Sequence, residues 1–216
     1  PLLNQALQQF EVDENKEATI AARGLILAAD LLNQKYNLIA TNPPYLVKGK
    51  QNSLLKDYTT SYYEIADADI ATVFFKRFCK FLNHNGTHLA VTPINWLFLK
   101  SYKELRLDLL NTQTINHFTK IGSGATAKES WDVLRALTII TKCEPTDNME
   151  VTGLEATTTD EESRAKELIN NNVKATKINY LKKSPDSRFI LTINKVKTLV
   201  EDKAWSYQGL ATADYP

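Results

Sequence analysis

The sequence predicts an α/β fold built on a largely parallel sheet, and three observations lead to this prediction. Patterns of helical period alternate along the chain with short apolar runs that suit buried strands. Two of these runs, 38–41 and 89–91, stop close to a proline, which cannot continue a strand ladder. The 216 residues, of which 43% are hydrophobic and 24% charged, have the composition of an ordinary globular protein with a sizeable core.

The first part of the chain is predicted to be mainly helical. Residues 1–10 carry apolar side chains at helical spacing and predict a short amphipathic helix. A second helical pattern covers 19–33, although part of it would also fit a strand that leads into a loop holding Asp30. The compact, partly β-branched run 38–41 then predicts a buried strand.

This strand is followed by a corner, Asn42-Pro43-Pro44-Tyr45. Both prolines lack an N–H and have a fixed φ, and the asparagine before them is pushed into an extended conformation, so the ladder ends here. The side-chain oxygen of Asn42 and the carbonyl of Pro43 are therefore free to accept hydrogen bonds, and Tyr45 adds a flat aromatic face. Such a corner suits a planar group that carries an NH2.

The chain after the corner continues the α/β alternation. Residues 46–69 are polar and irregular, and so long a loop is usually functional. Residues 67–82 predict an amphipathic helix, with Gly86 as its C-terminal cap. Residues 87–96 predict the next strand, whose apolar run 89–91 ends near a proline, and ligands are expected at the carboxyl ends of such parallel strands.

The last predicted elements are less regular. Residues 100–112 predict a helix with an apolar face, and 115–121 predict a strand. Residues 134–141 predict a strand that forms an antiparallel edge of the sheet. The acidic run 159–162 fits a capping box that opens a helix reaching residue 170.

The corner at a strand end resembles the catalytic loop of S-adenosylmethionine-dependent methyltransferases that modify an exocyclic or amide nitrogen, above all the adenine-specific DNA methyltransferases. The resemblance implies that the substrate is double-stranded DNA with a flipped adenine, stacked on Tyr45. Asn42 and the carbonyl of Pro43 would accept the two amino hydrogens, with Pro44 completing the corner. Positioning would then aim the nitrogen lone pair at the methyl group without a strong base.

The segment 86–118 narrows this resemblance. This segment resembles the corresponding region of large bacterial enzymes of the type IIG restriction–modification and PglX (BREX phage-defence) kind. The shared features, in order and at the same spacing, are Thr92-Pro93, Trp96 and the helix 101–106, which has the pattern Ser-Tyr-x-x-Leu-Arg. The resemblance implies the carboxyl-terminal portion of a Rossmann-like methyltransferase sheet with a helical connector, in a cytoplasmic bacterial protein. Other subunits of a defence system are expected partners.

The same resemblance implies S-adenosylmethionine as cofactor and Asp30 as a residue that binds it. In the family, an acidic residue about a dozen positions before the corner binds the adenine amino group of the cofactor. Gly122-Ser123-Gly124 has two interpretations. In methyltransferases of permuted motif order, a glycine-rich loop that binds the cofactor follows the catalytic corner, and these residues would be that loop. In those of linear motif order, the same position holds a Gly-x-Gly-Ala-Phe sequence instead. Linear order is favoured because Asp30 already precedes the corner, but Thr126 then stands where the family has an aromatic residue.

For the domain organisation, we expect residues 1–145 to form part of the methyltransferase catalytic domain without its amino-terminal cofactor half. Residues 146–207 would be a connector. Residues 208–216 would begin a DNA-recognition region, since 209–214 is similar to the Gly-Leu-x-Thr-Gly-Asp that opens it in the same enzymes. The start at Pro1 and a single methionine, Met149, indicate a segment of a longer protein.

The composition argues against several other classes of protein. The 2 cysteines and 3 histidines lack the spacing of a disulfide framework or a metal site, so no metal is expected. No apolar run reaches membrane-spanning length, and no membrane partner is expected. Two alternatives stay open: a methyltransferase acting on protein glutamine or RNA guanine, which uses the same corner, and a non-catalytic DNA-binding subunit of a defence complex.

Overall fold

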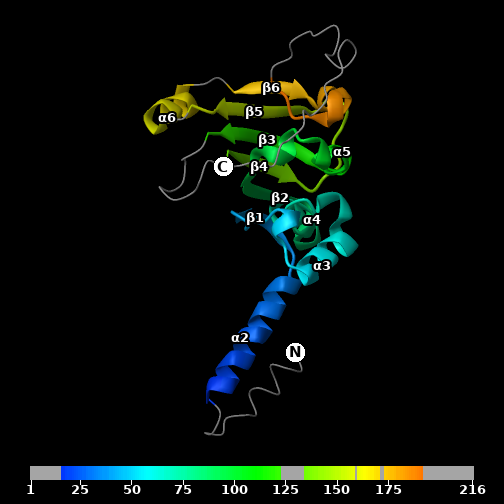
Figure 1. Ribbon diagram of the computed structural model, residues 1–216, viewed down its shortest axis with the longest axis vertical. Helices are drawn as coiled ribbons and strands as arrows, with labels where there is room; N and C mark the ends of the chain where they lie inside the picture. The colour runs from blue at the N-terminus through cyan, green and yellow to red at the C-terminus, as the bar shows by residue number, and fades with distance from the viewer. Residues whose placement is uncertain (1–15, 123–133, 159, 171–172, 192–216) are drawn as a thin grey trace, which may run out of the picture.

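A computed structural model of the protein describes residues 16–122, 134–158, 160–170 and 173–191. Within these residues, one mixed sheet of six strands has the order β1-β2-β4-β3-β5-β6 (Figure 1). The strands are β1 (Tyr36–Thr41), β2 (Leu82–Pro93), β3 (Thr114–Ile121), β4 (Arg135–Thr141), β5 (Glu150–Ala156) and β6 (Lys174–Lys177). The predicted α/β class is confirmed, but the expected largely parallel sheet is not, because three of the five pairings between these strands are antiparallel.

The direction of the strands determines which chain ends meet at one edge of the sheet. β1 is parallel to β2, and β3 is parallel to β5. β4 lies between β2 and β3 and is antiparallel to both, and β6 is antiparallel to β5. The carboxyl ends of β1, β2, β3 and β5 therefore lie at the same edge, together with the first residue of β4.

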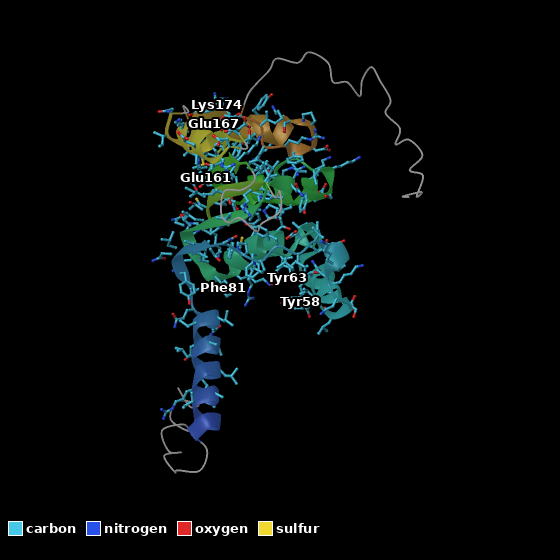
Figure 2. The ribbon with its side chains drawn as sticks, turned by 60° about the vertical axis from the view of Figure 1, so that its left-hand side comes forward. Tyr58, Tyr63, Phe81, Glu161, Glu167 and Lys174 are labelled. Atoms are coloured by element: carbon cyan, nitrogen blue, oxygen red, sulfur yellow. The ribbon has the colours of Figure 1, made fainter. Side chains whose placement is uncertain are left out.

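The helices are distributed along the sheet, with different helices in contact with β2, β3, β5 and β6. They are α2 (Lys16–Asn33), α3 (Ser53–Tyr63), α4 (Ile70–Phe81), α5 (Lys103–Thr112), α6 (Glu161–Asn170) and α7 (Ile178–Lys183). α2 extends away from the sheet on the β1 side, whereas α6 lies beside β5 and β6 (Figure 1). In Figure 2, Tyr58 and Tyr63 of α3 lie near Phe81 at the end of α4, far from Glu161 of α6.

A row of aromatic rings forms the centre of the core. Phe75 of α4 meets Trp96 with ring centroids 4.9 Å apart, and Trp96 meets Phe189 at 5.3 Å. Phe189 also meets Phe118 of β3 at 5.3 Å. These contacts are edge-to-face, an arrangement that aromatic rings favour. The row joins the helix before β2, the segment after β2, the middle of the sheet and the last described residues into one core.

Arg106 of α5 holds the segment that follows β2. Its side chain is fully buried and donates to the carbonyls of Trp96 (2.7 Å) and Leu99 (2.8 Å). Nε and Nη2 also donate to the carbonyl of Asp186, at 3.1 and 2.8 Å. Burial lowers the pKa of this guanidinium to about 10. The arginine of the Ser-Tyr-x-x-Leu-Arg pattern is thus a core residue that ties two distant stretches of main chain together.

Two details of the predicted fold are wrong. Residues 134–141 were expected at an edge of the sheet, but β4 lies in its interior, where Ala136 and Ile140 are fully buried. Gly86 was expected to cap a helix, but it lies within β2, where a Cβ would come within 3.0 Å of the Tyr36 carbonyl. Close approach of β1 therefore explains this glycine. The helix predicted over 1–10 lies outside the described residues.

His88 is an unusual core residue of β2. It is completely buried, with the rings of Phe75 and Phe78 at 5.6 and 5.0 Å, and neither ring nitrogen has a hydrogen-bond partner within the described part of the chain. Burial lowers its pKa to about 4. The folded protein therefore keeps this imidazole neutral in mildly acidic solution.

This histidine predicts a loss of stability in acid. An unfolded histidine titrates near pH 6.5, so the unfolded chain binds a proton that the folded chain rejects, and the free energy of unfolding falls as the pH drops below about 6.5. The loss should level off below about pH 4 and total roughly 3 kcal/mol. In urea titrations across this range, His88→Leu should remove this component, whereas His84→Leu, at an exposed position of the same strand, should retain it. Equal pH profiles for wild type and His88→Leu would contradict the assignment.

Candidate active site

The corner lies where β1 ends, at the edge of the sheet that also holds the ends of β2 and β3. The side chain of Asn42 is exposed, Pro43 is buried, Pro44 is exposed and Tyr45 is half-buried. The structure thus brings the four predicted residues together at the carboxyl end of a parallel strand, the expected place for a ligand in an open α/β sheet.

The hydroxyl of Tyr45 links the corner to the neighbouring strand. It donates to Oδ1 of Asn42 at 2.8 Å and lies 3.2 Å from the carbonyl oxygen of Val91 in β2. Burial raises the pKa of Tyr45, and the positive charge of Arg135 opposes this rise. The sequence predicted a role only for the aromatic ring of Tyr45, in stacking. It did not predict the contacts of the hydroxyl, because the tetrapeptide does not show which atoms of β2 lie beside it.

The chain leaving the corner is fixed to the start of α4. Oδ1 of Asp69 accepts from the backbone N–H of Leu46 at 3.2 Å and from that of Ala71 at 2.9 Å. The N–H of Ile70 donates in turn to the carbonyl of Leu46 at 3.1 Å. Asp69 is only 4% exposed, and burial raises its pKa. Sequence reasoning missed Asp69, although an aspartate just before a helical pattern is the usual sign of an N-cap.

We expect Asp69→Ala to lower the free energy of unfolding by about 2 kcal/mol, because it removes a helix cap and leaves two backbone N–H groups without their acceptor. Urea unfolding measures this change. Asn52→Ala is the matched control, since Asn52 is exposed and caps α3 with a single bond from the Leu55 N–H at 2.9 Å. A loss for Asp69→Ala no larger than that of the control would show that the contact with Leu46 contributes no stability.

The segment after the corner is more ordered than predicted. Instead of a long irregular loop it contains α3, flanked by short 3-10 turns. Lys48 pairs with the carboxylate of Asp67, which also accepts from the Thr60 hydroxyl at 2.9 Å. Lys50 and Lys56 are exposed.

The predicted cofactor residues are not brought to the corner. Asp30 lies on α2, exposed to solvent, and no contact joins it to the corner within the described residues. Gly122 is buried, with its N–H donating to the Ala156 carbonyl at 2.8 Å, and a Cβ there would meet the Thr158 carbonyl oxygen at 2.8 Å. Ser123, Gly124 and Thr126 lie outside the described residues.

The corner thus places the exposed carboxamide of Asn42 beside the half-buried Tyr45 at the end of a parallel strand. This arrangement is expected of methyltransferases that act on an amino or amide nitrogen. The chain belongs to the Eco57I restriction-modification methylase family, whose model matches residues 3–126. The matched range includes the corner and Asp30 and ends before Arg135.

Two curated relatives are adenine-specific methyltransferases. The chain is 31% identical over 107 residues to PglX of Lacticaseibacillus casei (strain Zhang), a match of 50% of this chain and 9% of that protein. It is 28% identical over 129 residues to BrxX of Escherichia coli O9:H4 (strain HS), a match of 60% of this chain and 11% of that protein. The matched part thus spans about a tenth of the length of either relative.

Solved structures share the fold. One from a type I restriction–modification system has a TM-score of 0.53 at 16% identity, covering 80% of this chain and 40% of that one. A DrdV–DNA complex has a TM-score of 0.52 at 11% identity, covering 74% of this chain and 19% of that one. Among the helices of the described residues, none has both the length and the apolar character needed to cross a membrane.

Proposed function

We propose that this chain is part of an adenine-specific DNA methyltransferase that moves a methyl group from S-adenosylmethionine to the exocyclic amino group of adenine in double-stranded DNA. The observation that carries the proposal is the corner itself, an exposed acceptor beside an aromatic ring at a strand end, in a member of a restriction–modification methylase family. Adenine presents the planar ring and the NH2 group that this corner suits.

The corner's part in the reaction is to position the amino nitrogen. Oδ1 of Asn42 has two lone pairs, of which the Tyr45 hydroxyl takes one, so the other remains for an N–H of the substrate. The Pro43 carbonyl is proposed to accept the second N–H, while the ring of Tyr45 stacks on the base. Two accepted hydrogen bonds leave the nitrogen lone pair directed away from the corner, where S-adenosylmethionine supplies an electrophilic methyl group.

Asp30 is the proposed cofactor ligand in this chain. Its carboxylate is an acceptor suited to an adenine amino group, and it is exposed on α2. It precedes the corner by 12 residues, as the family pattern requires. This chain does not supply a complete cofactor pocket among its described residues, and further contacts are proposed to come from the rest of the catalytic domain.

Exposed apolar residues support the proposal that the catalytic domain extends beyond this chain. Ile20, Leu25 and Leu27 of α2 are 70%, 73% and 61% exposed, and Leu38 of β1 is 63% exposed. β1 is hydrogen-bonded to one strand only, β2, within the described sheet. We propose that the amino-terminal cofactor half of the domain, which would precede the part formed by residues 1–145, covers these exposed residues of α2 and β1.

The rest of the chain is proposed to lead away from the catalytic domain. Residues 146–207 are the proposed connector, although they also contribute β5 and β6 to the sheet. Residues 208–216 are proposed to begin the DNA-recognition region. Double-stranded DNA and other subunits of a defence system are the proposed partners.

Methylome sequencing of a host with and without the full gene tests the function. We expect N6-methyladenine at one recurring sequence in the DNA of the host that carries the gene. If DNA methylation is unchanged but labelled methyl groups reach protein or RNA in the same cells, the corner acts on another substrate. If no macromolecule is labelled while the protein still binds DNA, the chain belongs to a non-catalytic subunit.

A further inference from the structure

The corner is held by hydrogen bonds at both of its ends. Before it, Thr41 ends β1 and pairs with Ala90 of β2. After it, Leu46 is bonded through its N–H, which donates to Oδ1 of Asp69 at 3.2 Å, and through its carbonyl, which accepts from the Ile70 N–H at 3.1 Å. Only the four residues of the corner lie between, and two of them are prolines with a fixed φ. The conformation of the corner therefore depends on how both ends are held.

A second side chain, that of Gln51, completes the bonds at Leu46. Its Nε2 donates to the Leu46 carbonyl at 3.1 Å, and its Oε1 accepts from the Thr59 hydroxyl of α3 at 3.1 Å. Gln51 is 8% exposed and Asp69 is 4% exposed, so water competes little with these bonds. Leu46 thus connects the corner to the first residues of both α3 and α4.

The bond from the Leu46 N–H to Asp69 acts most directly on the corner. This N–H belongs to the peptide unit that also contains the Tyr45 carbonyl, and a peptide unit is planar. Holding the N–H therefore restricts the ψ angle of Tyr45. The hydroxyl of Tyr45 donates in turn to Oδ1 of Asn42 at 2.8 Å. A rotation of this one peptide unit would move both the aromatic ring and the carboxamide.

We propose that Asp69 is a positioning residue: by accepting from the Leu46 N–H, it keeps the Tyr45 ring and the Asn42 carboxamide in the arrangement that receives the adenine. This inference deepens the proposed function and rests on it. Asp69 touches neither the substrate nor the cofactor in this account, and it acts only through the chain between Leu46 and Asn42.

The same carboxylate oxygen also has a purely structural task. Oδ1 of Asp69 accepts from the Ala71 N–H at 2.9 Å and so caps α4. Two substitutions separate the tasks. Serine still caps a helix, but its oxygen lies one bond closer to the main chain, so we expect it to leave the Leu46 N–H without an acceptor. Asparagine keeps an oxygen with two lone pairs in the place of Oδ1 and can serve both N–H groups.

The first test compares these variants in the longer polypeptide that carries this segment. Genomic DNA from a host without the gene and S-adenosylmethionine with a labelled methyl group serve as substrates. We expect Asp69→Ser to lower kcat about tenfold, of the order of one lost hydrogen bond, with the KM for DNA unchanged. Asp69→Asn should keep most of the wild-type rate. Urea unfolding should show that Asp69→Ser retains more stability than Asp69→Ala, because it retains the cap.

Asp160→Ala is the matched control, because Asp160 also caps a helix, α6, by accepting from the Ser163 N–H at 2.8 Å, away from the corner. It should lower stability and leave kcat unchanged. A wild-type rate for Asp69→Ser would overturn the proposal, as would equal losses of rate in Asp69→Ser and the control. Equal losses in Asp69→Ser and Asp69→Asn would also overturn it, because the negative charge would then matter and not the acceptor. A wild type that labels no DNA would instead overturn the proposed function.

A second measurement does not depend on methyl transfer. In the 216-residue chain with 15N-labelled asparagine, NMR relaxation gives the order parameter of the Asn42 side-chain nitrogen. We expect Asp69→Ser to lower it, and Asp69→Asn and Asp160→Ala to leave it at the wild-type value. An order parameter unaffected by Asp69→Ser would overturn the proposal even if the enzyme methylates DNA.

Discussion

In the proposed full-length methyltransferase, the Asn42→Ala variant is expected to transfer methyl groups at least a hundredfold more slowly than the wild type. Alanine removes one of the two acceptors proposed for the amino group, and loss of a preorganised contact to the reacting group commonly lowers turnover by about a hundredfold to a thousandfold. It also removes the acceptor of the Tyr45 hydroxyl, 2.8 Å away. Single-turnover incorporation of labelled methyl groups measures the rate, and a filter-binding assay should show that DNA binding persists.

Asn37→Ala is the control for this variant. Asn37 is also an exposed asparagine of the β1 region, and its Oδ1 accepts from Nδ2 of Asn83 at 2.8 Å, away from the corner. We expect it to methylate DNA at the wild-type rate. Asn42→Asp keeps acceptor oxygens at the same place and should lose less than the alanine variant. Full activity of Asn42→Ala would remove Asn42 from the reaction.

The Arg106→Met variant is expected to lose several kcal/mol of unfolding free energy. The substitution keeps an apolar side chain but leaves the carbonyls of Trp96, Leu99 and Asp186 without the bonds that Arg106 donates. Each buried polar group deprived of its partner costs about 1–3 kcal/mol. Urea unfolding of the 216-residue chain should show the lower midpoint.

Arg188→Met provides the comparison, because Arg188 pairs with the carboxylate of the same residue, Asp186, at 3.0 Å. Its side chain is 46% exposed, and an exposed ion pair contributes about 0–1 kcal/mol. We expect its stability to remain close to that of the wild type. Similar losses for the two arginine variants would mean that the buried carbonyls of the α5 site find other donors.

Much of the site was predictable because it is encoded locally. Asn42 and Tyr45 are three residues apart, and the prolines between them determine where the strand ends. The helices over 70–81 and 103–112 were likewise visible in the spacing of their apolar residues.

What the sequence did not predict depends on contacts between distant segments. The interior position of β4 results from pairing on both sides, where Thr138 lies opposite Ala90 of β2 and Phe118 of β3. No local sequence pattern indicates which distant strands will pair. The sequence of a strand with buried side chains is also similar whether the strand lies at an edge or in the interior of a sheet. The contact of the Tyr45 hydroxyl with the Val91 carbonyl was missed for the same reason, because these residues become neighbours only when β1 and β2 pair.

The bonds from Arg106 to Asp186 also bear on where the protein can be cut for laboratory work. The arginine and its acceptor are 80 positions apart, and the ring of Phe189 lies between Trp96 and Phe118. A truncation at residue 145 would expose those two rings. It would also remove the Asp186 carbonyl, which accepts two of the hydrogen bonds of the buried Arg106 guanidinium. Any recombinant version of this region should therefore extend past residue 191, so that the last described side chains can close the aromatic core.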